Sequence, residues 1–266
     1  MDLNKYVHDL EKDPAMGFFN RKAGIAIYLF HLSRHTKDQD AEESAFNLME
    51  EVANHIDLKS GAGFANGLSG IGAGISYIIR NEFMEGDEDE ILTELDYYLF
   101  RYLYNTMHTD LSLNTGVIGA GHYFLNRIKS KTAISHSVHI MQVKMWLLMV
   151  LDLSATQFNL PGYTFMEPKK LSNREIIDIE YFLLCLVESG ICNELSCRIM
   201  RNLKIAHPSP AYNPLDRLKI AELNGDDLPS ALKALSEDKS YQNRLPQKLA
   251  NLSLTNPSLP AWWRLF

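Results

Sequence analysis

Apolar positions recur every three to four residues along most of this chain, which is the spacing of one face of an α-helix. Two kinds of helix alternate in its first half. One kind follows a polar loop and is rich in glycine and alanine, as in Gly70 to Ile79. The other kind is an ordinary amphipathic helix, predicted over residues 42–56, 91–104 and 136–151, and further helices are predicted over residues 173–189, 193–205, 216–223 and 228–235. The pattern therefore predicts an all-α chain.

Three segments superimpose without gaps and define an internal repeat. They are FFNRKAGIAIYLFHLSR from Phe18, FANGLSGIGAGISYIIR from Phe64 and LNTGVIGAGHYFLNRIK from Leu113. Their central glycines, Gly24, Gly70 and Gly119, are 46 and 49 residues apart, which is the length of a two-helix unit. The repeat predicts an array of helical hairpins, each with a glycine-rich inner helix and an amphipathic outer helix.

The glycines of the inner helices predict close contacts between neighbouring helices. A glycine inside a helix costs about 1 kcal/mol relative to alanine, so Gly70, Gly72 and Gly74 need a compensating gain. Close approach of backbones supplies it, and inner helices packed this tightly curve towards a ring, a partial α/α toroid. An open solenoid of the same helices is the alternative. A membrane helix pair is excluded by the short apolar segments and by Arg34 and Arg80.

Composition and charge limit the partners of the chain. The chain has 266 residues, 46% hydrophobic and 22% charged, with a formal net charge of -7, so we expect no nucleic-acid partner and no anionic membrane surface. Its apolar runs reach only about ten residues, where a membrane span needs about 20. Three cysteines and an acidic N-terminal segment without a signal-peptide stretch predict a cytoplasmic protein.

The second repeat carries a motif of a known family. Phe64-Ala-Asn-Gly-Leu-Ser-Gly-Ile-Gly resembles the F-A-H-G-x-A-G-I element of the lanthionine synthetase C-like (LanC-like) family, cyclases that act on dehydrated ribosomal peptides. Lys22-Ala-Gly-Ile-Ala and Thr115-Gly-Val-Ile-Gly resemble weaker copies, so the resemblance covers roughly residues 15–130. It implies an α/α toroid whose inner-helix loops face a central cavity. In active members that cavity holds a zinc ion bound by two cysteines and a histidine.

The sequence departs from the family at the residues of its chemistry. The chain has no Cys-His dipeptide and no tryptophan beside a cysteine, and Asn66 stands where the family motif has its histidine. Asparagine cannot donate a proton near neutral pH. Cys185, Cys192 and Cys197 lack the C-x₂₋₄-C spacing of most structural zinc sites. We therefore expect core thiols, no metal, no cofactor and no catalytic residue, as in a pseudoenzyme without cyclase activity.

Five residues are candidates for binding a ligand near the cavity mouth. They are Asn20, Arg21, Asn66, Thr115 and His122. A local role is the alternative, since asparagine and threonine are good N-cap residues for the helices that follow them. His122 would then be a hydrogen-bonded histidine on a helix flank.

The second half of the chain does not align with the repeat. We expect repeats over residues 1–153, a linker over 154–172 that contains Pro161, Gly162 and Pro168, and a divergent helical region over 173–266. A second copy, another protein or these C-terminal helices would cover the open side of a partial ring.

Three functions follow from these observations. The first is binding of a peptide or of a peptide-modifying enzyme in ribosomal-peptide biosynthesis, as the resemblance implies. The second is a helical-repeat interaction scaffold unrelated to peptide modification. The third is a degenerate carbohydrate-processing toroid, which would need paired carboxylates, whereas Asp110 is the one carboxylate in the predicted inner-helix loops.

Overall fold

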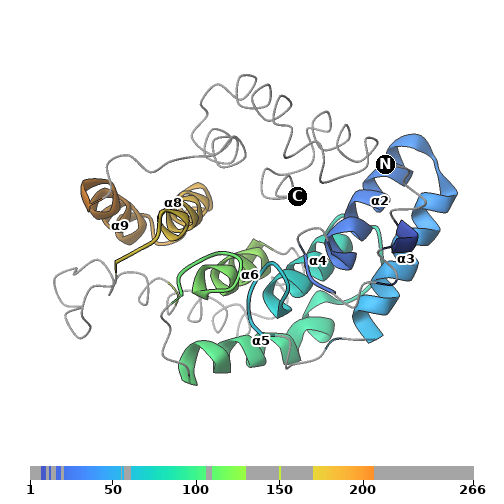
Figure 1. The fold of residues 1–266 in the computed structure, drawn as a ribbon, viewed down its shortest axis with the longest axis horizontal. Coiled ribbons are helices and arrows are strands. Elements are labelled where there is room, and N and C mark those ends of the chain that lie inside the picture. Colours follow the sequence, from blue (N-terminus) through green and yellow to red (C-terminus); the bar gives the residue numbers. More distant parts are fainter. Residues whose placement is uncertain are drawn as a thin grey trace. The chain divides into compact units, whose positions relative to one another are not determined.

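A computed structural model describes nine stretches of the chain (Figure 1). They are residues 7–9, 12, 16–18, 21–54, 56, 61–105, 110–129, 150 and 170–206. These residues form helices joined by turns, with no strand among them, so the all-α prediction is confirmed. They belong to two compact units, one up to residue 56 and one from residue 61 to residue 206.

The first unit contains the first predicted hairpin. Helix α2 (Lys22–Thr36) ends at Lys37, which has φ 60° and donates its backbone N–H to the carbonyl of Ser33. Helix α3 (Gln39–Asn54) follows after two residues and packs against α2. Such a short connection makes the two helices neighbours in space.

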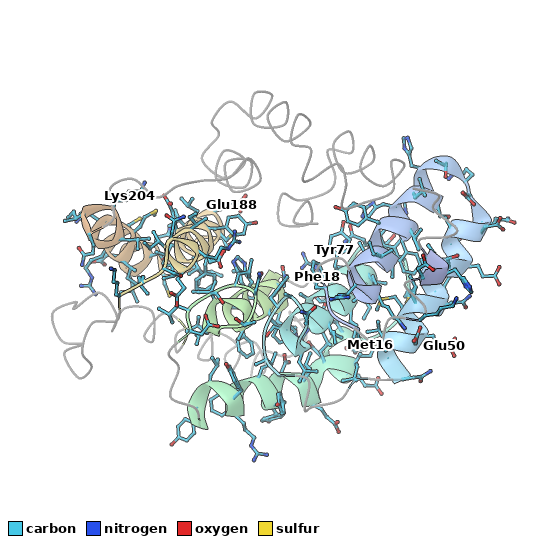
Figure 2. The ribbon with its side chains drawn as sticks, viewed as in Figure 1. Met16, Phe18, Glu50, Tyr77, Glu188 and Lys204 are labelled. Carbon is cyan, nitrogen blue, oxygen red and sulfur yellow. The ribbon has the colours of Figure 1, made fainter. Side chains whose placement is uncertain are left out.

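The core of this hairpin follows the predicted division into inner and outer helices. Helix α2 is buried from Lys22 to Ser33, whereas α3 buries one face, made of Ala41, Ala45, Leu48, Met49 and Val52. Phe30 of α2 meets Phe46 of α3 edge to face, with ring centroids 5.0 Å apart. The buried Lys22 forms an ion pair with Glu51. Phe18, the first residue of the first repeat, is also fully buried (Figure 2).

The second unit contains the next two repeats and two later helices. They are α4 (Leu68–Arg80), α5 (Glu88–Asn105), α6 (Val117–Lys129), α8 (Asn173–Glu188) and α9 (Asn193–Ala206). Helix α4 packs on α5 and α6, α6 also packs on α8, and α8 packs on α9 (Figure 1). The glycine-rich inner helices α4 and α6 and the amphipathic α5 are confirmed, as are the helices predicted over 173–189 and 193–205.

Glycines allow these helices to approach closely, as predicted. A Cβ on Gly72 of α4 would lie 2.5 Å from Cε2 of Tyr123 on α6 and 2.3 Å from Cδ2 of Leu95 on α5. A Cβ on Gly121 of α6 would lie 2.7 Å from Cζ of Phe182 on α8. Each of these glycines therefore makes room for a large side chain of a neighbouring helix.

Several predictions fall on residues outside the described ones. They are the helices over 216–223 and 228–235, the helix over 136–151 apart from its buried Val150, and the linker up to residue 169. Closure of a ring stays a prediction. Among the described residues, no helix combines the length and the apolar character that crossing a bilayer requires.

Candidate functional site

The loops that precede α4 and α6 are built alike. They are residues 61–67 and 110–116. In each loop the first helical N–H donates back to the first loop carbonyl, over 3.0 Å from Leu68 to Gly61 and over 3.1 Å from Val117 to Asp110. The buried Ser69 hydroxyl donates to the carbonyl of Ala62. This bond explains Ser69 as a structural residue.

The two loops are in direct contact. The N–H of Ala65 donates to the carbonyl of Asn114 over 3.0 Å. A Cβ on Gly63 would lie only 2.4 Å from that same carbonyl oxygen, so the contact requires glycine at this position. The loops therefore lie side by side, and we call the surface formed by residues 61–67 and 110–116 the inner-loop face.

Two of the five candidate residues lie on the inner-loop face. Asn66 and Thr115 are both exposed, and Asn114 is exposed beside Thr115. The hydroxyl of Thr115 donates to Oδ2 of Asp110 over 2.5 Å, and Oδ1 of Asp110 accepts the N–H of Ser112 over 2.8 Å. The structure thus brings Asn66 and Thr115 onto neighbouring loops of fixed conformation.

These hydrogen bonds also set the charge state of Asp110. Partial burial raises the pKa of a carboxyl group, but the hydrogen bonds from Thr115 and Ser112 outweigh it, so the pKa of Asp110 lies below its ordinary value. The side chain is therefore a carboxylate at neutral pH, and its charge faces the turn that carries Thr115.

The capping alternative is wrong for Asn66 and Thr115. The N-cap of α4 is Gly67, and α6 begins at Val117, two residues after Thr115. A Cβ on Gly67 would lie 2.6 to 2.7 Å from backbone atoms of Gly61 and Gly63, so a larger residue does not fit where the loop folds beneath the helix. The polar side chain is displaced by one residue, to a position where it is exposed.

The other three candidate residues lie elsewhere. Arg21 is half-buried and is the N-cap of α2 in the first unit, without a side-chain cap bond. Asn20 lies outside the described residues. His122 lies in the second turn of α6 and is half-buried, with its ring stacked on Tyr181 at 5.2 Å.

Further aromatic contacts surround His122. The ring of Phe182 meets it edge to face at 5.2 Å and that of Phe64 at 6.3 Å. Contacts of this kind support a packing role for this histidine. A ligand-binding role for His122 and Arg21 stays a prediction.

Sequence reasoning missed two carboxylates of α8 that hold the loop before α6. Oε1 of Glu175 accepts the N–H of Leu111 over 3.1 Å, and Oδ2 of Asp178 accepts the N–H of Leu113 over 2.8 Å. Glu175 also completes a capping box with Ser172, the N-cap of α8. The Ser-x-x-Glu spacing was a visible signal for the capping box, but not for the contact with a loop about 60 residues earlier.

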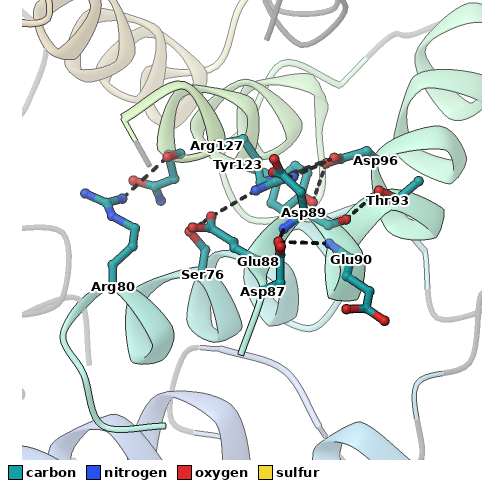
Figure 3. Close-up of polar contacts among 11 residues, drawn as sticks. Ser76, Arg80, Asp87, Glu88, Asp89, Glu90, Thr93, Asp96, Tyr123 and Arg127 are labelled. Atoms are coloured by element: carbon teal, nitrogen blue, oxygen red, sulfur yellow. Dashed lines mark hydrogen bonds and ion pairs between the residues drawn. The ribbon is translucent and has the colours of Figure 1, made fainter. Parts of the chain in front are cut away.

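Sequence reasoning also missed a buried ion cluster between α4, α5 and α6 (Figure 3). The guanidinium of Arg127 lies 3.0 Å from Glu88, 2.7 Å from Asp89 and 3.1 Å from Asp96. Arg127 is 1% exposed, and Glu88 and Asp96 are fully buried. Acidic residues are common in the first turn of a helix, where they are usually exposed to solvent. Asp87 fits this pattern, because its Oδ1 accepts the N–H groups of Asp89 and Glu90.

Two hydroxyl groups complete the cluster. Ser76 donates to Glu88 and Tyr123 donates to Asp96, each over 2.5 Å. Burial raises the pKa of Tyr123 well above its ordinary value, and the charge of Asp96 adds to this effect, so the phenol keeps its proton. Burial alone would lower the pKa of Arg127, but the carboxylate of Asp96 more than offsets it. The guanidinium is therefore charged and ties α5 to α6.

The three cysteines lie in different elements of the second unit. Cys185 is buried in α8, Cys192 lies in the turn after α8 with φ 51°, and Cys197 is exposed on α9. Burial raises the pKa of Cys192, which disfavours the thiolate that binds zinc. Within residues 7–206 as far as they are described, no group of three His, Cys, Asp or Glu side chains is arranged to hold a metal ion.

Comparison with known proteins identifies the family. The family model of the lanthionine synthetase C-like proteins matches residues 21–162, which is more than half of the chain. No curated protein and no solved structure matches the chain significantly. The match includes the three repeat glycines, Gly24, Gly70 and Gly119, and the inner-loop face. The chain therefore belongs to the lanthionine synthetase C-like protein family.

Proposed function

We propose that this protein binds a peptide at its inner-loop face, within a ribosomal-peptide pathway, and does not itself catalyse cyclisation. The observation that carries the proposal is the pair of touching loops with exposed Asn66, Asn114 and Thr115. Asparagine offers two donors and one acceptor, which match the N–H and C=O groups of a peptide backbone.

The rigidity of the face supports a binding role. Three backbone hydrogen bonds hold the loops. They run from the N–H of Ala65 to the carbonyl of Asn114, from that of Leu68 to Gly61 and from that of Val117 to Asp110. A surface that is already ordered loses little conformational entropy when a ligand binds. The exposed amide side chains are therefore presented on a fixed frame.

The residues of the motif support binding without cyclase chemistry. Asn66 occupies the position of the histidine in the family motif, and its amide does not titrate near neutral pH. The sequence also has no Cys-His dipeptide and no tryptophan beside a cysteine, which are the elements that carry the zinc ligands in active members.

The carbohydrate alternative gains no support from the carboxylates near the loops. A glycosidase needs a general acid whose pKa is raised, whereas the pKa of Asp110 is lowered. Glu175 and Asp178 are buried, and their oxygens accept loop N–H groups. Two other candidates are binding of a peptide-modifying enzyme and a scaffold role unrelated to peptide modification. The test below separates both from peptide binding.

The test is titration of the full chain with a dehydrated precursor peptide and with its unmodified form, followed by isothermal calorimetry. Each lost hydrogen bond contributes about 0.5 to 1.5 kcal/mol, so Asn66→Ala and Thr115→Ala should weaken binding by about 2- to 13-fold. Asn54→Ala, exposed at the end of α3, is the matched control and should bind like the wild type.

Three results would contradict the proposal. The first is equal affinity in Asn66→Ala, Thr115→Ala and wild type. The second is thioether formation by the chain alone with the dehydrated peptide. The third is about one zinc per chain in the purified protein that is lost on Cys→Ser substitution. If the protein binds a modification enzyme but no peptide, the peptide-binding proposal is wrong and binding of a peptide-modifying enzyme is favoured instead.

A further inference from the structure

The packing of α8 on α6 repeats the packing of α6 on α4. Gly72 and Gly121 occupy the same column of the repeat. Tyr123 of α6 fills the space over Gly72, and Phe182 of α8 fills the space over Gly121. Phe182 therefore corresponds to Tyr123, with an offset of 59 residues along the chain.

The contacts with the preceding loop give the same correspondence independently. A Cβ on Gly119 would lie 3.0 Å from the backbone nitrogen of Phe64. Phe64 and Leu113 occupy the same column of the repeat, and the N–H of Leu113 is bound by Asp178. Asp178 therefore lies at the backbone nitrogen of Leu113, as Gly119 lies at that of Phe64. Asp178 corresponds to Gly119, which is again 59 residues earlier in the chain.

We infer that α8 is the next inner helix of the array, and that Asp178, in the column where α6 carries glycine, is a positioning residue for the inner-loop face. The family model ends at residue 162, so this assignment extends the array beyond the matched region. The positioning role rests on the proposed peptide-binding function.

The burial of Asp178 strengthens its hydrogen bond to the loop. The side chain is 1% exposed and Leu113 is 2% exposed, so water does not compete for the bond. The other carboxylate oxygen of Asp178 accepts from Arg174 over 2.7 Å. A hydrogen bond from a buried N–H to a charged acceptor is stronger than one between neutral groups.

The carboxylate positions the loop that carries Thr115. Asp178 holds the N–H of Leu113, and Glu175 holds that of Leu111. Between them, Ser112 donates its N–H to Asp110, which in turn accepts from Thr115. The two helix carboxylates thus fix the start and the middle of the loop, and Thr115 takes its position from them.

The test combines nuclear magnetic resonance of the full chain with peptide titration for Asp178→Asn and Asp178→Ala. We expect Asp178→Ala to speed amide hydrogen exchange at Leu113 by about tenfold or more and to weaken peptide binding. Asp178→Asn keeps an oxygen acceptor and should restore both properties towards the wild type. Glu194→Ala, exposed on α9, is the matched control and should change neither.

Each outcome decides the inference. Unchanged exchange at Leu113 in Asp178→Ala would overturn it, as would faster exchange with unchanged peptide affinity. If Asp178→Ala does not fold, Asp178→Asn decides alone, because loss of the charge must move the amide proton resonance of Leu113 while Glu194→Gln leaves it in place. A wild-type chain that binds neither peptide would refute the proposed function and the positioning role, whereas the exchange result would still test α8 as an inner helix.

Discussion

Replacing Arg127 by methionine tests whether the buried cluster holds the second unit together. Methionine replaces the aliphatic part of the arginine side chain with a similar unbranched apolar chain. It lacks the guanidinium that contacts Glu88, Asp89 and Asp96. Ser76 and Tyr123 would still donate to two of these carboxylates. The variant therefore leaves three buried carboxylates together without a cation.

The size of the effect follows from burial. Breaking a buried ion pair by removing one partner costs about 3 to 5 kcal/mol. Glu88 and Asp96 are fully buried and Asp89 is 7% exposed, so we expect the upper half of this range, about 4 to 5 kcal/mol. For a unit of roughly 150 residues this corresponds to a Tm lower by about 8 to 20 °C.

Urea and thermal unfolding followed by circular dichroism measure this change. Arg80→Met is the matched control, because Arg80 is exposed and its guanidinium donates to the carbonyl of Asn126 over 3.4 Å. A double variant of Arg127→Met with Asp96→Asn should recover part of the loss, since it removes one of the buried charges. A loss below about 1 kcal/mol, or one equal to that of the control, would refute the argument.

Three further predictions concern other parts of the chain. Burial, with a contribution from Arg34, lowers the pKa of His31 to about 4. The unfolded chain therefore binds more protons than the folded chain between about pH 4 and 6.5, and the free energy of unfolding should fall by up to about 3 kcal/mol as the pH falls through this window. In urea titrations His31→Gln should abolish this dependence, whereas substitution of the exposed His35 should preserve it. Gly72→Ala should destabilise the fold by about 1 to 3 kcal/mol through overpacking against α5 and α6, and a stabilised variant in thermal unfolding would contradict the close approach. Ser172→Ala removes half of a capping box and should cost about 0.5 to 2 kcal/mol, measured by urea unfolding against wild type.

Local patterns in the sequence predicted most of the helices in the described residues. Each helix depends on spacing within about 15 residues, which the sequence displays directly. Boundaries were less accurate where a side chain decided them. Helix α3 begins at Gln39 rather than at residue 42 because Oδ1 of Asp38 accepts the N–H of Ala41 and starts the helix earlier.

Contacts between distant residues were not predictable in the same way. The glycine columns predicted close packing, but not which side chain would fill each space. Asp178 lies in an apolar stripe with no glycine around it, so α8 carried no visible trace of the repeat. The acidic start of α5 resembled an exposed helix start, since its partner Arg127 lies more than 30 residues later.

The candidate site was predictable only where a local motif marks it. Asn66 and Thr115 were found because a motif marks both loops. Each loop folds under the helix that follows it because Gly67 and Gly116 have no side chain there. The carboxylates that hold the loop come from α8, which the motif does not include.

The equal span of the two inner loops limits where this chain can tolerate insertions and deletions. In both loops the residue with the accepting carbonyl and the residue with the donating N–H are seven positions apart, and the two loops touch each other. One residue added to either loop would misalign the closing bond of that loop and the bond between Ala65 and Asn114. Changes in repeat length, such as the step from 46 to 49 residues, are therefore confined to the outer helix and its connections, so this end of the array can be conserved while the rest of each hairpin diverges.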